Sequence, residues 1–401
     1  MRLKNAQIFC GEKGFVHGSL EMEDGLIKNL VLDGHALDGP AGETKEHAPV
    51  RRETEKNNPV CGKTEEIDLQ GAFLLPGLVD IHTHGNSGCD FSDGDYEGLR
   101  KMGRYLLRCG ITSFLPTSMT LPFEKLDQAY RTALRYMQEA PEDGARVAGI
   151  HMEGPFFSEK KKGAQNEAYL KNPDPDFFKE LHKNCEGRIR LVDIAPELPG
   201  AQAFARQISD ICTVAQGHTD ATYEDAKAVF EAGASHVTHL FNAMPPIHHR
   251  NPGVIGAAAE RNDVTAELIC DGLHVHPAIM RMAFKLFPGR ICLISDSLRC
   301  CGMPDGTYEL GGQTVYMKNQ EARLADGTLA GSSINLYEGL QRTISFGIPV
   351  RDAIMAATIV PARAIGLDHQ IGSIEEGKYA DLLVCDASWQ LQQVYLGGRV
   401  R

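Results

Sequence analysis

The stretch Leu78-Val-Asp-Ile-His-Thr-His-Gly85 decides the fold of this chain, because it is an apolar run that ends in two histidines. Side chains alternate along a β-strand, so His82 and His84 would project from the same face and could hold one metal ion. Later apolar runs end in the same kinds of polar, metal-binding or turn residue. The eight runs are residues 78–84, 111–117, 147–153, 189–196, 213–218, 236–241, 265–271 and 291–296.

Amphipathic helical patterns lie between several of these runs, at residues 97–109, 123–139, 223–232 and 277–287. Strands that alternate with helices, and that gather polar residues at their ends, predict an α/β fold. The predicted architecture is a (β/α)8 TIM-like barrel with its site at the C-terminal face of the strands. The alternative is a doubly wound open sheet, but no Gly-rich phosphate turn follows the first run.

Both ends of the chain carry short strand patterns, at residues 3–9, 14–22 and 26–32 and again at 394–400. We expect them to pair into one small β-sandwich domain that the barrel interrupts. Helices are also expected at 334–346 and 350–365. The predicted division is residues 1–70 for the first part of the small domain, with a charged surface excursion at 33–66, residues 71–366 for the barrel, and residues 367–401 for the second part.

The composition of the 401 residues is that of a globular protein, with 42% apolar and 23% charged residues. A formal charge of -12, without a long basic stretch, argues against a nucleic-acid or anionic-membrane surface. The polar beginning of the sequence and the lack of a long apolar run predict a cytoplasmic protein. Eleven irregularly spaced cysteines do not indicate a disulfide framework.

The strand ends supply a set of candidate metal ligands. Glu153, His218 and His239 come from three different runs and would leave a coordination position open for water. His82 and His84 could hold a second ion, with Glu153 bridging the two. Zinc, iron or manganese suits such ligands. A metal ion lowers the pKa of bound water from about 16 to about 7, which makes a nucleophile available at neutral pH.

Asp296 ends the eighth run and is the natural general base, because a carboxylate beside the metal water can take its proton and return it to a leaving amine. An isolated Asp after a strand would more simply cap a helix or turn, and an isolated His would more simply be a hydrogen-bonded core residue. The whole set of strand-end residues favours the metal site. His151 lies on the same strand as Glu153, and a structural role is at least as good an explanation for it.

Together with six sequence motifs, these residues resemble the amidohydrolase superfamily and, more narrowly, its N-acetylglucosamine-6-phosphate deacetylase family. The resemblance spans nearly the whole chain. The motifs that carry it are Pro-Gly-Leu-Val-Asp-Ile-His-Thr-His-Gly at 76–85, His-Met-Glu-Gly-Pro-Phe at 151–156, Gly-His-Thr at 217–219, Thr-His-Leu-Phe-Asn-Ala-Met at 238–244, Asp-Gly-Leu-His at 271–274 and Leu-Ala-Gly-Ser at 329–332.

The resemblance implies a metal-dependent hydrolase that removes acetate from N-acetylglucosamine 6-phosphate, in amino-sugar catabolism or cell-wall recycling. Glu153, His218 and His239 would be the principal ligands of a zinc or iron ion and Asp296 the acid and base. His274 would polarise the acetyl carbonyl. The implied substrate-binding residues are Ala164, Gln165, Asn242, Ala243, His248, Arg250, Asp271, His274, Leu329, Ala330 and Gly331.

Arg250 resembles the family's phosphate-binding arginine, a role that suits the planar fork of guanidinium donors. That arginine can serve the neighbouring subunit's site, so the resemblance implies a homodimer, and His248 could assist. Some family members lack the first histidine pair and use one ion. Because His82 and His84 are present, either one or two ions per subunit are compatible with the sequence.

Three other interpretations compete with this one. One is a different metal-dependent amidohydrolase, such as a dihydroorotase-like or adenine-deaminase-like protein. Against it, this chain has no obvious carboxylated-lysine candidate at the end of the fourth run. A binding or scaffold protein on the same barrel would show decayed ligands, and none is missing. A phosphate-free N-acetyl amino sugar would leave Arg250 without an anion to bind.

Overall fold

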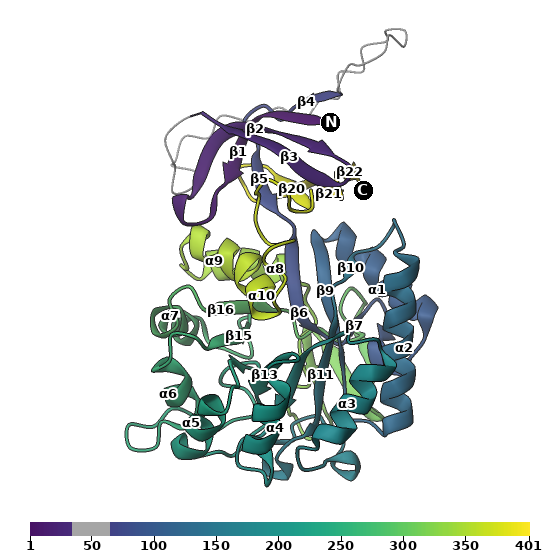
Figure 1. Ribbon diagram of the computed structural model, residues 1–401, viewed down its shortest axis with the longest axis vertical. Coiled ribbons are helices and arrows are strands. Elements are labelled where there is room, and N and C mark those ends of the chain that lie inside the picture. The colour runs from purple at the N-terminus through teal and green to yellow at the C-terminus, as the bar shows by residue number, and fades with distance from the viewer. Residues whose placement is uncertain (34–64) are drawn as a thin grey trace.

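The computed structural model describes residues 1–33 and 65–401, which form a barrel of parallel strands and a separate sheet that holds both ends of the chain (Figure 1). The surface excursion predicted at 33–66 lies almost entirely outside the described residues. Within those residues, no helix is both long enough and apolar enough to cross a lipid bilayer.

The predicted barrel is confirmed, and its strands follow one another around the barrel in chain order. Closure between the last strand and the first is made at their ends, where the Asp296 backbone N–H donates to the His82 carbonyl oxygen at 2.9 Å. The barrel strands are β6 (Leu78–Thr83), β9 (Ile111–Ser118), β11 (Ile150–Phe156), β12 (Ile189–Ile194), β13 (Thr213–Gln216), β14 (His236–Val237), β15 (Thr265–Ile269) and β16 (Ile291–Ile294).

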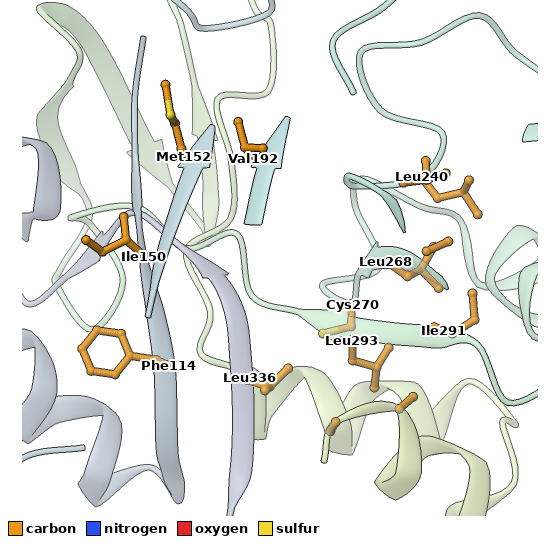
Figure 2. Packing of buried hydrophobic residues seen from close by; sticks show 14 of the residues in the cluster. Phe114, Ile150, Met152, Val192, Leu240, Leu268, Cys270, Ile291, Leu293 and Leu336 are labelled. Atoms are coloured by element: carbon orange, nitrogen blue, oxygen red, sulfur yellow. The ribbon is translucent and has the colours of Figure 1, made fainter. Parts of the chain in front are cut away.

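Alternation along the strands separates the side chains that face the outer helices from those inside the barrel, which form an apolar cluster with α10 (Ile359–Ala364) and also include polar groups. On β15, Leu268 belongs to the main apolar cluster beneath the helices, whereas Glu267 beside it bonds to residues inside the barrel. Figure 2 shows Cys270 and Leu293 pointing toward α8 (Leu336–Ser345), the helix that carries Leu336. Because successive side chains face opposite ways, the same strands bury a core and present polar groups to the interior.

Helices surround the barrel, and the four predicted between its strands are present (Figure 1). The structure adds three that the sequence analysis did not identify. The helices of the barrel are α1 (Tyr96–Arg108), α2 (Phe123–Glu139), α3 (Pro175–Asn184), α4 (Ala201–Ile208), α5 (Tyr223–Glu231), α6 (Gly253–Ala259) and α7 (Pro277–Leu286), and the predicted helix at 334–346 is α8.

The single helix predicted at 350–365 is wrong, because the structure has two, α9 (Val350–Ala356) and α10 (Ile359–Ala364). Pro361 explains the division. Proline lacks a backbone N–H, and its ring would clash with the carbonyl of the residue four positions earlier, Ala357. The backbone therefore leaves the helical region at Thr358, where φ is -134° and ψ is -85°.

The strands of the small domain, predicted as a β-sandwich, are hydrogen-bonded into one sheet with the order β22-β21-β20-β5-β1-β2-β3, and β4 pairs with β1. N-terminal and C-terminal strands meet where β5 pairs with β20. The strands are β1 (Arg2–Phe9), β2 (Phe15–Glu23), β3 (Leu26–Leu32), β4 (Glu66–Asp68), β5 (Phe73–Pro76), β20 (Leu382–Cys385), β21 (Leu391–Leu396) and β22 (Arg399–Val400). The predicted domain boundaries stay a proposal; by hydrogen bonding, the first part of the sheet reaches Pro76.

The junction between the two domains fixes which end of the barrel is free for chemistry. Strand β5 leaves the small sheet and, after Gly77, continues into β6 (Figure 1). The N-terminal end of β6 therefore faces the small sheet. The C-terminal end, with His82 and His84, lies at the opposite end of the barrel.

A three-stranded antiparallel sheet follows the last barrel strand and was not predicted. It comprises β17 (Gly306–Leu310), β18 (Gln313–Lys318) and β19 (Glu321–Arg323). Its buried side chains, among them Leu310 and Val315, pack with Met119 and Leu298 from the barrel loops in a cluster of their own. This sheet therefore lies over the C-terminal end of the barrel.

Gly77 allows the close approach of the domain junction to β9. A Cβ atom at Gly77 would lie 2.1 Å from the Thr112 Oγ1 atom and 2.7 Å from its Cβ. We predict that Gly77→Ala lowers the free energy of unfolding by about 1–3 kcal/mol, the usual cost of overpacking. Gly306→Ala is the control, because its Cβ would meet nothing closer than 3.6 Å. Equal melting temperatures for wild type and Gly77→Ala would contradict the prediction.

Candidate metal centre

The predicted ligands and the predicted base converge at the C-terminal strand ends, on a backbone that turns sharply. His218, His239 and Asp296 all have positive φ, of 46°, 27° and 46°. Non-glycine residues in this region cost about 1–3 kcal/mol each, and such conformations cluster at functional sites. Here the turn at each strand end directs a side chain toward the barrel axis.

Glu153, His218 and His239 form the first group. The Glu153 Oε1 atom lies 3.2 Å from the Nε2 atom of each histidine. The two Nε2 atoms are 3.0 Å apart. All three side chains are nearly inaccessible to solvent, and their ligand atoms lie within 4.8 Å of one another.

His82, His84 and Asp296 form the second group, next to the first. The His84 Nε2 atom lies 3.3 Å from both the Asp296 Oδ1 atom and the His82 Nε2 atom. Glu153 also contacts this group, because its Oε2 atom lies 3.3 Å from His84 Nε2. The structure therefore places Glu153 between the two histidine pairs, where a bridging carboxylate would be.

The contacts of the Nδ1 atoms show which imidazole nitrogen faces the centre. The His218 Nδ1 atom lies 2.9 Å from the Lys161 carbonyl oxygen and the His84 Nδ1 atom 3.2 Å from the Thr117 carbonyl oxygen. A carbonyl can only accept, so each Nδ1 carries the proton and, in the neutral ring, each Nε2 presents a lone pair. Lone pairs that converge on carboxylate oxygens repel one another unless a cation lies between them.

The surrounding histidines keep the carboxylates of the centre ionised. Burial alone would raise the pKa of Glu153, but its interactions with His218, His239, His82 and His84 together outweigh burial and hold that pKa well below its ordinary value. Asp296 shows the same balance, with its pKa lowered because attraction to His82 and His84 outweighs desolvation. Both carboxylates are therefore ionised at neutral pH and suited to a cation.

His151 and Asp193 form a structural pair rather than a part of the metal centre. The His151 Nδ1 atom lies 3.1 Å from the Ile81 carbonyl oxygen, and Nε2 lies 3.0 Å from both Asp193 oxygens. Both ring nitrogens thus face acceptors inside the protein, and a metal ion at either nitrogen would have to replace that contact. His82, His151 and Glu267 also lie close enough together to hold an ion, but this pairing argues against it.

Beside the metal centre lies a pocket of about 340 Å³, which is within the range of small-molecule sites. Most of the predicted site residues line it: His84, Glu153, Ala164, Gln165, His218, His239, Asn242, Ala243, His274, Asp296, Leu329, Ala330 and Gly331. The unpredicted lining residues are Met119, Lys160, Lys161, Gly163, Ile269, Leu310 and Thr328.

Two of the predicted substrate-binding residues hold other site residues in place. The Gln165 side chain donates to the Glu153 Oε2 atom at 2.7 Å and accepts the Thr120 backbone N–H at 2.7 Å. Asp271 accepts from His274 Nδ1 at 2.6 Å, which directs the other ring nitrogen of His274 toward the pocket. Asp271 is not among the described residues that line the pocket.

His248 and Arg250 lie away from this pocket. Both are exposed, on the loop between β14 and α6, and the Arg250 guanidinium contacts the His249 Nε2 atom at 2.7 Å. The described pocket lining includes neither residue. The lysines that line the pocket are Lys160 and Lys161, which belong to a short 3-10 helix (Glu159–Lys161). They belong to the longest basic stretch of the sequence, and that stretch could have identified them.

Comparisons with known proteins agree with this geometry. The amidohydrolase family profile matches residues 73–400. N-acetylglucosamine-6-phosphate deacetylase from Bacillus subtilis is 39% identical over 80% of this chain and 82% of its own, and N-acetylgalactosamine-6-phosphate deacetylase from Escherichia coli O157:H7 is 35% identical over 85% and 90%. A mutant of N-acetyl-D-glucosamine-6-phosphate deacetylase from Mycobacterium smegmatis, solved in complex with N-acetyl-D-glucosamine-6-phosphate, superposes with a TM-score of 0.86 at 30% identity, covering 100% of this chain and 98% of that one.

We predict that Zn²⁺ added to metal-stripped protein raises the melting temperature, because the ion binds only the folded centre. Ligand at a hundred times its dissociation constant contributes about 2.7 kcal/mol. Glu153→Gln should lose most of this rise, since Glu153 contacts both histidine pairs. Asp193→Asn, a buried carboxylate in a histidine pair outside the centre, should keep it. An equal rise in Glu153→Gln would contradict the assignment.

Proposed function

We propose that this chain, which belongs to the amidohydrolase family, hydrolyses N-acetyl-D-glucosamine 6-phosphate to D-glucosamine 6-phosphate and acetate. The observation that carries the proposal is the convergence of histidine Nε2 atoms and ionised carboxylates on one wall of a pocket for a small molecule. Relatives and a solved structure that match almost the whole chain are deacetylases of phosphorylated amino sugars. The reaction would belong to amino-sugar catabolism or cell-wall recycling, and a cytoplasmic location stays a prediction.

The metal-binding groups would hold one or two divalent ions per subunit, with zinc or iron as the proposed metals. Glu153, His218 and His239 would hold the first ion, and His82 and His84 the second, with Asp296 within reach. A bound ion supplies a water of lowered pKa and a positive charge beside the acetyl carbonyl.

Asp296 is the proposed base and acid of the reaction. Its carboxylate lines the pocket and its lowered pKa keeps it ionised, so it can accept a proton from the attacking water. The water oxygen bonds to the carbonyl carbon, and the bond between that carbon and the amide nitrogen then breaks. Asp296 returns the same proton to the leaving nitrogen, which gives the free amine and acetic acid, and the acid ionises to acetate.

His274 is the proposed donor to the acetyl oxygen. Its Nδ1 atom is bonded to Asp271, so donation from Nε2 requires a proton on both ring nitrogens. The Asp271 carboxylate compensates that positive charge. Burial alone would raise the Asp271 pKa, but the interaction with the His274 side chain and the backbone N–H groups of Leu273 and His274 together lower it. A preorganised donor of this kind stabilises the oxyanion as charge develops on it.

The other lining residues would position the sugar. Asn242 and Ala243 are proposed to meet the sugar phosphate through side-chain and backbone donors. Ala164, Gln165 and residues 329–331 are proposed to line the sugar. Leu310 at the end of β17 lines the same pocket, so the three-stranded sheet forms part of its wall.

Arg250, with His248, is proposed to bind the phosphate in the site of a second subunit. The guanidinium is exposed and lies outside the pocket lining of its own described chain, so a role in phosphate binding is best met across a dimer interface. A homodimer is therefore part of the proposal.

A second candidate substrate is the C4 epimer, N-acetyl-D-galactosamine 6-phosphate. It is favoured by one observation, the relative named for that substrate, whose identity of 35% is close to that of the glucosamine enzymes. Both substrates share the N-acetyl and phosphate groups, so the metal centre would treat them alike. Discrimination would rest on residues that meet the sugar ring.

The proposal predicts fast, chelator-sensitive acetate release from N-acetylglucosamine 6-phosphate, slower release from its C4 epimer, and little from unphosphorylated N-acetylglucosamine. Asp296→Asn should lower kcat by about 10²–10⁴-fold, the usual contribution of a general base. Ser297→Ala is the control, because Ser297 is an adjacent buried residue that bonds to Thr83 and Gly85 outside the pocket. No release from either phosphorylated sugar by metal-loaded wild type would reject the function.

We predict that Arg250→Ala raises KM for the phosphorylated sugar about 10-fold or more, because a charge-assisted bond is worth about 1.5–3 kcal/mol. Lys227→Ala, which removes an exposed basic residue of α5, should leave KM near the wild-type value. An unchanged KM in Arg250→Ala would remove this residue from phosphate binding.

Mixing two impaired variants tests whether Arg250 acts between subunits. A dimer of Arg250→Ala with Asp296→Asn contains one site that has both Asp296 and the partner subunit's Arg250. Mixed dimers should therefore recover activity at low substrate concentration. No recovery in verified mixed dimers would place Arg250 in its own subunit's site.

A further inference from the structure

Glu267 is a buried carboxylate that the reaction as proposed does not use. It lies on β15 with no side-chain exposure, and it points into the barrel, behind the metal-binding groups as seen from the pocket. Burying an unpaired carboxylate costs free energy, so the partners of Glu267 indicate its role. It does not line the described part of the pocket.

The contacts of Glu267 reach both metal-binding groups. Its Oε2 atom lies 2.9 Å from His82 Nδ1 and accepts the backbone N–H of His239 at 3.0 Å. Its Oε1 atom lies 3.3 Å from the Nε2 atom of His236, on the neighbouring strand β14. One oxygen therefore touches a histidine of the second group and the backbone of a histidine of the first.

We propose that Glu267 is a positioning residue that orients His82 and His239 together and so sets the affinity of the centre for its second ion. The inference rests on the proposed metal-dependent function. Glu267 itself makes no bond to an ion in this proposal, because its Oε2 atom is engaged by His82 and the His239 backbone, and its Oε1 atom lies 3.3 Å from His236 Nε2.

The contact with His82 determines which ring nitrogen can bind an ion. A carboxylate beside Nδ1 holds the proton there, and the lone pair of Nε2 is directed at the centre, 3.3 Å from His84 Nε2. Partners of this kind orient the imidazole and raise its basicity as a ligand. Their loss usually lowers metal affinity by about 10–100-fold.

The contact with His239 acts through the backbone. His239 has a positive φ of 27°, which is unfavourable for a residue with a side chain. A buried acceptor for its N–H helps to hold this turn, and the turn directs the imidazole toward Glu153. Removal of Glu267 should therefore weaken the second ion most and the first ion less.

Metal binding by the full-length protein tests the inference. Glu267→Gln keeps the side-chain volume and one acceptor but removes the charge, and Glu267→Ala removes the acceptor altogether. Ion content per chain and the two dissociation constants are measured in buffered Zn²⁺. We expect the second ion to bind about 10–100-fold more weakly in Glu267→Ala, with Glu267→Gln between it and wild type.

The spectrum of the Co²⁺-loaded protein provides a second readout that a purely structural role would not change. Asp193→Asn is the matched control, because Asp193 is equally buried and also pairs with a histidine, and it should bind ions as wild type does. Folded Glu267 variants with wild-type stoichiometry, affinities and Co²⁺ spectrum would overturn the inference. If only Glu267→Gln folds, its affinities decide. Failure of wild type to bind metal would instead reject the proposed function.

Discussion

The convergence of imidazole lone pairs on buried carboxylates is the constraint on which the rest of the site depends. Glu153 lies within 3.3 Å of a histidine of each pair, and both histidine pairs have their Nε2 atoms close together. Without a cation, such groups can share protons or repel one another. Their burial is energetically favourable only when a metal ion provides the missing positive charge, because the desolvation of each ionised group costs several kcal/mol.

The barrel makes this arrangement possible through the alternation of its strands. Each strand places one set of side chains under the outer helices and the other inside, so the outer core and the polar groups of the interior come from the same segments. Leu268 and Glu267 are neighbours in sequence, yet one belongs to the main core and the other supports the metal centre. Stability and chemistry thus occupy opposite faces of β15.

Periodicity and local motifs predicted the barrel, the small domain and the metal groups, because each strand and each ligand motif can be recognised from a few neighbouring residues. The sequence analysis missed β17–β19, whose strands pack against loops from elsewhere in the chain. It also predicted one helix at 350–365 although Pro361 divides it, an error that attention to the proline would have avoided. Tertiary contacts, rather than local propensity, determine segments such as β17–β19.

The supporting residues were the hardest to predict, because their partners are far away in sequence. Glu267 pairs with His82 across the barrel, 185 positions away, and nothing around residue 267 indicates a metal. Arg250 is the opposite case: its motif indicates a phosphate, but its exposed position places it away from the pocket of its own chain. A motif identifies the chemistry of a side chain, while only the fold determines which site, and which subunit, receives it.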